Sequence, residues 1–251
     1  MRSPDNGNDA GNGAAEPEGL SAPLRKSKIR VLMPYTKAAK KESGDIKQSA
    51  SLALKLASDS AAAGGAKAKF QLAGTLLVKH KEKSFEKDLR KLQKGKKKFK
   101  ATHKQRDKKK ADLVAMLRAS GAYCGLGYLN ENPVKSDEQY GFSVTAVNCV
   151  TNHSVAHEMG HNAGLEHDRF VLTYTPTTSE HNFGYVNTSA MVRSVMAYAN
   201  KCSTCTRVPM FSSTAKMWNG TDMLGVAPPS ADAADASRTL NDNRKVISKF
   251  R

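Results

Sequence analysis

Residues 157–168 carry the pattern that most constrains this chain. The segment reads His-Glu-Met-Gly-His-Asn-Ala-Gly-Leu-Glu-His-Asp and follows the spacing H-E-x-x-H-x-x-G-x-x-H. His157 and His161 are four residues apart, so on a helix their imidazoles project from one face. Gly164 can adopt a positive φ and end the helix, and the turned chain then returns His167 to the same point. Three protein ligands that leave a fourth position open are typical of a catalytic zinc site.

The residue after the first histidine completes the predicted chemistry. Glu158 projects from nearly the same face as the ligands and can reach a water molecule at the open position. We therefore predict that Glu158 is a general base and that His157, His161 and His167 bind zinc. A surface helix that merely carries histidines is the alternative. His153 is four residues before His157, and we expect it at the helix start, exposed and not a ligand.

Charge is distributed unevenly along the 251 residues. The formal net charge is +17, and residues 79–110 alone hold 16 Lys and Arg against 4 Asp and Glu. This segment is either a solvated helical face or a surface that binds nucleic acid or an acidic partner by counterion release. A basic binding protein is thus the alternative to an enzyme. Few aromatic residues interleave the lysines, so stacking on bases, and with it a nucleic-acid partner, is not expected.

The chain contains no run of about 18 apolar residues, so no transmembrane helix is expected. Its first 24 residues lack the apolar stretch of a signal peptide, and we expect residues 1–27 to form a disordered leader. The cysteines are Cys124, Cys149, Cys202 and Cys205, which allow three disulfide pairings. Disulfides are favoured in a secreted enzyme, and free thiols are the alternative.

The hydrophobic patterning predicts alternating strands and helices. Strands are expected at residues 29–34, 70–78, 111–117, 124–129 and 142–147. Helices are expected at residues 41–63, 84–110 and 231–251, with the zinc helix directly after the fifth strand. This order predicts a mixed α/β sheet.

With these elements, the chain resembles the metzincins, and within them the reprolysin-like and peptidyl-Asp metalloendopeptidase group. Residues 157–168 carry the resemblance, together with Ser-Val-Met-Ala-Tyr-Ala-Asn at 194–200 and the segment 202–212. Residues 29–34, 124–129 and 142–149 fit the same pattern, so the resemblance runs from about residue 28 to the end.

The resemblance implies a zincin-like α+β fold for a catalytic domain at residues 28–251. An N-terminal lobe, residues 28–164, would hold a twisted mixed five-stranded sheet and two long helices. A small C-terminal lobe, residues 165–251, would be held beneath the zinc by a methionine turn at Met196. Asp168 would have a structural role in the loop. Tyr198 would either stabilise the transition state or only pack beside the ligands.

The implied activity is a zinc-dependent endopeptidase that acts on protein or peptide substrates, possibly acidic ones. The strand of Gly125, Leu126 and Gly127 would be an edge strand that receives the substrate, or else a covered strand with small residues for packing. We expect disulfides Cys124–Cys149 and Cys202–Cys205, the first of which would tie that strand to the loop entering the zinc helix. A secreted monomer is expected, although no signal peptide is visible.

Overall fold

The protein is described over residues 25–251 in a computed structural model, and a five-stranded sheet forms its centre. The strands are β1 (Ser27–Thr36), β2 (Ala68–Val78), β3 (Leu113–Arg118), β4 (Gly125–Gly127) and β5 (Phe142–Ala146). Their order is β2-β1-β3-β5-β4, in which β4 alone runs antiparallel to its neighbour. The predicted mixed five-stranded sheet is confirmed. The expected leader, residues 1–27, lies outside the described residues except for its last three.

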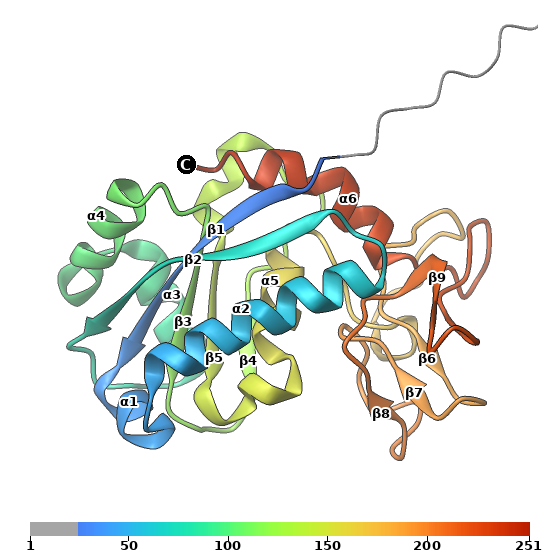
Figure 1. Cartoon of the computed structure of the whole chain (residues 1–251), viewed down its shortest axis with the longest axis horizontal. Coiled ribbons are helices and arrows are strands. Elements are labelled where there is room, and N and C mark those ends of the chain that lie inside the picture. The colour runs from blue at the N-terminus through green and yellow to red at the C-terminus, as the bar shows by residue number, and fades with distance from the viewer. Residues whose placement is uncertain (1–24) are drawn as a thin grey trace, which may run out of the picture.

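Helices cover both faces of the sheet, so the central strands β3 and β5 are fully buried, whereas the edge strand β2 is partly exposed. In β1, Ile29, Val31 and Met33 pack in the core beneath α2 (Ile46–Ala63), α5 (Ser154–Asn162) and α6 (Ala236–Ile247). Leu32 points the other way, into the core beneath α3 (Phe85–Lys94). Figure 1 shows α2 along one face of the sheet and the mostly irregular residues after α5 gathered at one end of the molecule.

Two of the predicted helices are interrupted. Residues 37–63 form α1 (Lys37–Ser43) and α2, because Gly44 turns the chain with φ 69° and the Asp45 side chain caps α2. The prediction of one helix over residues 84–110 is also wrong. Gly95 ends α3 in the left-handed region, and the chain continues as η1 (Lys97–Phe99) and α4 (Lys100–Lys108).

The zinc helix does not follow β5 directly, because the 3₁₀ helix η3 (Val147–Asn152) lies between them. Cys149 of η3 forms a disulfide with Cys124, the residue before β4. This bond ties the edge strand to the segment that enters α5. The second predicted pair, Cys202–Cys205, is also bonded and closes a short loop after Met196.

The residues after α5 form a small second lobe with little regular structure. Its strands are β6 (Val186–Asn187), β7 (Val192–Arg193), β8 (Thr206–Arg207), β9 (Ser213–Trp218) and β10 (Asp222–Leu224), and its 3₁₀ turn is η4 (Arg169–Val171). Another 3₁₀ turn, η2 (Lys135–Tyr140), lies earlier in the chain, between β4 and β5. The closing helix α6 returns to the first lobe, where Leu240 and Ile247 join the core under the sheet. Among residues 25–251, no helix is long and apolar enough to cross a membrane.

Candidate metal centre and active site

Three histidine nitrogens meet at one point beside α5. The Nε2 atoms of His157 and His161 are 3.2 Å apart, and that of His167 lies 3.1 Å from His161 and 3.2 Å from His157. Four-residue spacing on α5 aligns the first two side chains, and the loop after the helix returns the third. The three atoms therefore form a nearly equilateral triangle.

Backbone carbonyls fix the orientation of two of these rings. The Nδ1 atom of His157 lies 2.9 Å from the Val195 carbonyl oxygen, and that of His161 lies 2.8 Å from the Leu165 carbonyl oxygen. Since a carbonyl only accepts, both Nδ1 atoms carry the proton and both Nε2 atoms present a lone pair. Converging lone pairs repel one another unless a cation lies between them.

The triangle fits zinc. Tetrahedral coordination with bonds of about 2.0–2.1 Å places nitrogens about 3.3 Å apart, close to the separations found here. Burial lowers the pKa of His161 to about 4 and that of His157 well below its ordinary value. Burial, followed by the charge of His161, lowers the pKa of His167 to about 3. All three rings are therefore neutral at pH 7, the form that binds a metal.

Gly164 shapes the end of the zinc helix. Its φ of 93° lies in the region that favours glycine, and a Cβ at this position would lie 2.6 Å from the Glu131 carbonyl oxygen. The turn places the Leu165 carbonyl beneath His161 and sends the chain on to His167. One glycine thus positions both the third histidine and the carbonyl that orients the second.

Met196, the residue predicted to form a methionine turn, packs against α5, the helix that carries His157 and His161. Met196 is fully buried, and a Cβ on Gly160 of α5 would lie 2.6 Å from its sulfur atom. The preceding residue, Val195, supplies the carbonyl for His157. Asp168 is also buried, and its Oδ2 accepts a hydrogen bond from the Tyr198 backbone N–H at 2.8 Å. Asp168 therefore connects the third-histidine loop to the methionine turn.

Glu158 packs against the two glycines of β4. A Cβ on Gly125 would lie 2.5 Å from Glu158 Oε1, and a Cβ on Gly127 would lie 2.6 Å from the Glu158 carbonyl oxygen. Glycine at both positions lets the strand approach α5 closely. Burial raises the pKa of Glu158 to about 8, whereas the charge of Arg207 and the Gly127 N–H lower it. The carboxyl is therefore a strong proton acceptor.

β4 is the last strand of the sheet, so one of its two sides has no neighbouring strand. The contact with α5 leaves that side open. Cys124 accepts a hydrogen bond from Ala146, and Tyr128 donates one to Phe142, both in the direction of β5. Because pairing alternates along an antiparallel strand, the backbone groups of Gly125 and Gly127 face the other way. A cavity of about 320 Å³ lies there, lined by β4, Leu129, the three histidines, Glu158, Glu166 and Tyr198.

Tyr198 lies beside the ligands. Its ring centroid is 4.2 Å from that of His167 and 5.8 Å from that of His157, and 39% of the residue is exposed. Burial and the nearby Glu158 charge raise the pKa of Tyr198, so its phenol keeps its proton near neutral pH. His153, in contrast, is half-buried with its Nδ1 3.4 Å from Ser60 Oγ, so the expectation of an exposed residue is wrong.

Several residues that support the site were not anticipated. The carbonyls of Val195 and Leu165 carry no sequence signal, since any residue has one. Arg193 and Arg207 both donate to the Ala197 carbonyl, at 2.7 and 3.2 Å, and thereby brace the methionine turn from β7 and β8. Gly160 did carry a signal, because a glycine inside a helix indicates close packing.

Comparison with known proteins supports this geometry. Residues 54–168 match the family model described as metallo-peptidase family M12B reprolysin-like. That segment runs from α2 through the third histidine to Asp168. No curated protein sequence matches the chain significantly.

A solved structure described as "Structure of a chaperone-substrate complex" superposes with a TM-score of 0.69 at 16% sequence identity. The match covers 91% of this chain and 40% of that chain, so this chain spans less than half of its length. At this identity the likeness concerns the fold alone. The family match over residues 54–168, together with the histidine triangle and the buried methionine, shows that this part of the chain is similar to reprolysin-like metallopeptidases.

Proposed function

We propose that the chain is a zinc-dependent endopeptidase. A metallopeptidase family implies protein or peptide substrates and a peptide-hydrolase activity. The observation that carries the proposal is the triangle of three neutral histidine nitrogens, because its dimensions fit tetrahedral zinc and one side opens into the cavity along β4. Zinc, when bound there, polarises the scissile carbonyl and activates a water molecule for attack.

The protein side chains carry out the proton transfers. Glu158 accepts a proton from the attacking water and delivers it to the leaving amine nitrogen. Its buried position against β4 keeps the carboxyl basic. The Val195 and Leu165 carbonyls keep the Nδ1 protons of His157 and His161 in place, so both rings present the Nε2 lone pair to the metal.

The substrate would bind as an extended strand alongside β4. The backbone groups of Gly125 and Gly127 that face away from β5 would form hydrogen bonds with the substrate main chain. This arrangement accepts a chain that continues in both directions, which supports cleavage at internal bonds. Two formed disulfides favour an oxidising compartment, so we propose that the enzyme acts outside the cell.

The endopeptidase proposal predicts cleavage of peptides that have both ends blocked. We expect the purified full chain, supplied with zinc, to cut an unbiased library of N-acetylated, C-amidated peptides at internal bonds. A chelator should stop the reaction and added zinc should restore it, because the ion binds reversibly to neutral histidines. Mass spectrometry of the products gives the cut positions. Cleavage of free-ended peptides alone, one residue at a time, would contradict an endopeptidase.

Tyr198 is proposed to donate a hydrogen bond to the carbonyl oxygen of the substrate as negative charge develops on it. For Tyr198→Phe we expect kcat to fall by about ten- to a hundredfold, somewhat less than for loss of a main oxyanion donor, with KM little changed. The phenyl ring keeps its packing against His167, so the zinc content should stay at the wild-type value. An unchanged kcat would show that Tyr198 only packs beside the histidines and does not stabilise the transition state.

A further inference from the structure

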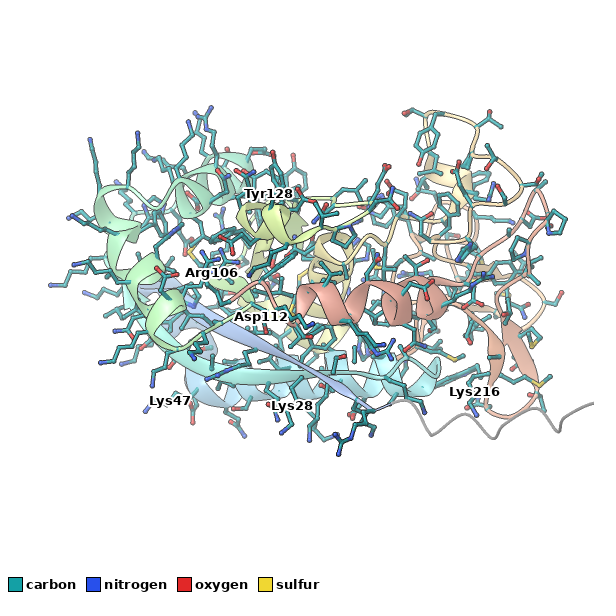
Figure 2. The ribbon with its side chains drawn as sticks, turned by 90° about the horizontal axis from the view of Figure 1, so that it is seen from above. Lys28, Lys47, Arg106, Asp112, Tyr128 and Lys216 are labelled. Atoms are coloured by element: carbon teal, nitrogen blue, oxygen red, sulfur yellow. A yellow bond between two sulfur atoms is a disulfide. The ribbon has the colours of Figure 1, made fainter. Side chains whose placement is uncertain are left out.

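A lysine-lined groove lies on the first lobe, away from the zinc site. Its walls are Lys91, Lys94, Lys96, Lys97 and Lys98, from the end of α3 and the turn into η1. The floor consists of His80 and Phe99, whose ring centroids are 4.9 Å apart. The groove has a volume of about 360 Å³. We call this site the lysine groove, and Figure 2 shows the long nitrogen-tipped side chains that radiate from this end of the molecule.

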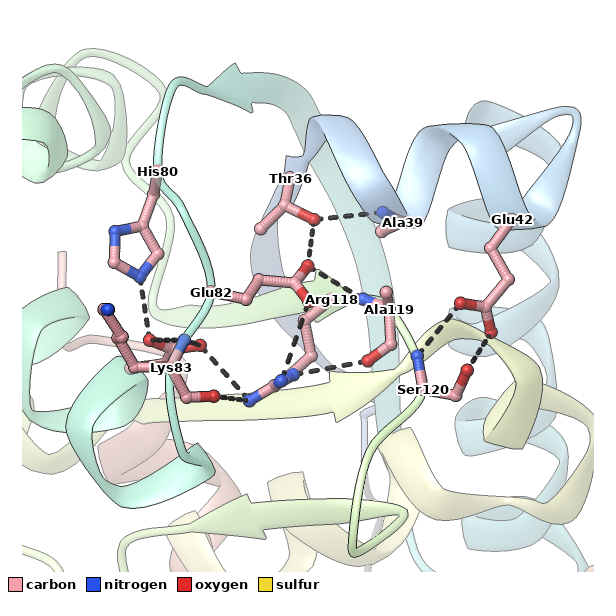
Figure 3. Close-up of polar contacts among 10 residues, drawn as sticks. Thr36, Ala39, Glu42, His80, Glu82, Lys83, Arg118, Ala119 and Ser120 are labelled. Carbon is pink, nitrogen blue, oxygen red and sulfur yellow. Dashed lines mark hydrogen bonds and ion pairs between the residues drawn. The ribbon is translucent and has the colours of Figure 1, made fainter.

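The positive charge of the groove is not neutralised by the acidic residues nearby in sequence. Glu82 and Asp88 both pair with the buried Arg118, at 3.6 and 3.2 Å, and Asp88 also lies 2.7 Å from His80 Nε2 in the groove floor. Figure 3 shows Glu82 beside Arg118. Asp107 pairs with Arg251. Within residues 25–251, none of the five groove lysines forms an ion pair. The groove therefore presents five exposed ammonium groups to solvent.

The turn that carries three of these lysines has a fixed shape. Gly95 adopts φ 63°, and a Cβ there would lie 2.7 Å from the His103 ring, so the chain reverses tightly at this point. Lys97 itself has φ 53°, a conformation that few non-glycine residues adopt. Phe99 anchors the far end of the turn, with 2% of its surface exposed. A fixed turn loses little conformational entropy when it binds a ligand.

The chemistry of the groove favours one kind of polyanion. Phe99 is buried, so no aromatic face in the groove is open for a base to stack on, which disfavours single-stranded nucleic acid. The walls contain only lysine, whose point charge suits separate anionic groups better than the bidentate pairing that arginine forms with carboxylates. The two disulfides favour an oxidising compartment, and a linear sulfated glycan presents separate anionic groups along its length, which suits a row of point charges.

We propose that the lysine groove binds a linear sulfated polysaccharide. The ammonium groups contact successive sulfates, and the aliphatic lysine stems pack against the sugar rings. Binding releases counterions, so affinity depends steeply on salt. The groove would localise the enzyme on a glycan-rich surface without taking part in hydrolysis.

The test measures binding of a fluorescein-labelled heparin octasaccharide to the full chain by anisotropy, over a series of sodium chloride concentrations. Relative to wild type, the variant Lys96→Gln/Lys97→Gln/Lys98→Gln should bind about tenfold more weakly at 0.1 M salt, with a log–log salt slope smaller by about 2 to 3. The matched control, Lys28→Gln/Lys216→Gln/Lys245→Gln, removes the same charge from exposed sites on other elements, and its affinity should stay within about twofold of wild type.

Two further variants distinguish an effect on glycan binding from an effect on folding or on catalysis. Lys91→Gln/Lys94→Gln leaves the turn intact and should also weaken binding, by about three- to tenfold. Glu158→Gln should bind the octasaccharide as wild type does, whether or not the chain proves to be a peptidase. Equal weakening in the groove and control variants would overturn the proposal. So would undiminished binding of a desulfated octasaccharide, or tighter binding of duplex DNA or polyglutamate at the same salt.

Discussion

Replacing Glu158 with glutamine is expected to lower kcat/KM by at least about a thousandfold while zinc stays bound. Glutamine has nearly the same shape, so packing against Gly125 and Gly127 persists, but an amide cannot accept and return the water proton. Since Glu158 is not one of the three converging ligands, the metal content should remain one ion per chain. Hydrolysis of an internally quenched peptide and elemental analysis give the two values.

Glu166→Gln is the matched control for this experiment. Glu166 lines the same cavity and is also buried, and its Oε1 accepts the His167 backbone N–H at 2.7 Å. Glutamine retains that acceptor, so we expect kcat/KM to change by less than about tenfold. If Glu158→Gln kept near wild-type turnover, or if both variants lost activity equally, Glu158 would not be the proton carrier.

The histidine triangle was predictable from sequence because its geometry is local. The spacing of His157 and His161 fixes their common face on any helix, and the positive φ of Gly164 fixes the return of His167. The sheet was predictable for a similar reason. Its strands are short apolar runs bounded by turn residues, so the sequence predicts their existence and order, with ends that differ from the observed ones by at most two residues.

The helix interruptions show what sequence periodicity does not resolve. Leu89 and Leu92 recur at a helical spacing, and the lysines that follow are also good helix formers. Sequence alone therefore predicts one helix over residues 84–110. The structure stops α3 at Gly95, where the chain reverses over His103 and buries Phe99. Phe99 is buried by its contact with one face of the sheet. This contact joins residues far apart in the sequence, so no local pattern predicts it.

The hydrogen bonds that support the histidines and Met196 could not be predicted from sequence, for a different reason. The carbonyls of Val195 and Leu165 orient the zinc-binding rings through main-chain atoms, which every residue possesses. Arg193 and Arg207 lie on strands of two residues each, too short for a recognisable pattern, and converge on Ala197 only in the folded chain. Partners of this kind can be named only once the fold is known.

Replacing His161 with alanine is expected to abolish both zinc binding and activity. The remaining histidines provide two nitrogens, and the loss of a direct ligand should weaken zinc affinity by more than the 10- to 100-fold typical of outer partners. Zinc at about a thousand times its dissociation constant stabilises a folded chain by about 4 kcal/mol. Wild type should therefore unfold at a clearly higher temperature with zinc than with chelator, and His161→Ala should show no such difference.

His181→Ala serves as the control for histidine removal. The side chain of His181 bonds only to the Ser179 carbonyl and lies outside the histidine triangle, so this variant should keep its zinc, its activity and the zinc-dependent rise in unfolding temperature. Calorimetry with and without zinc, together with elemental analysis, measures both effects on the same samples. Because Leu165 loses the partner of its carbonyl in His161→Ala, a lower unfolding temperature in chelator alone is also expected. Stoichiometric zinc retained by His161→Ala would show that the triangle is not the metal site.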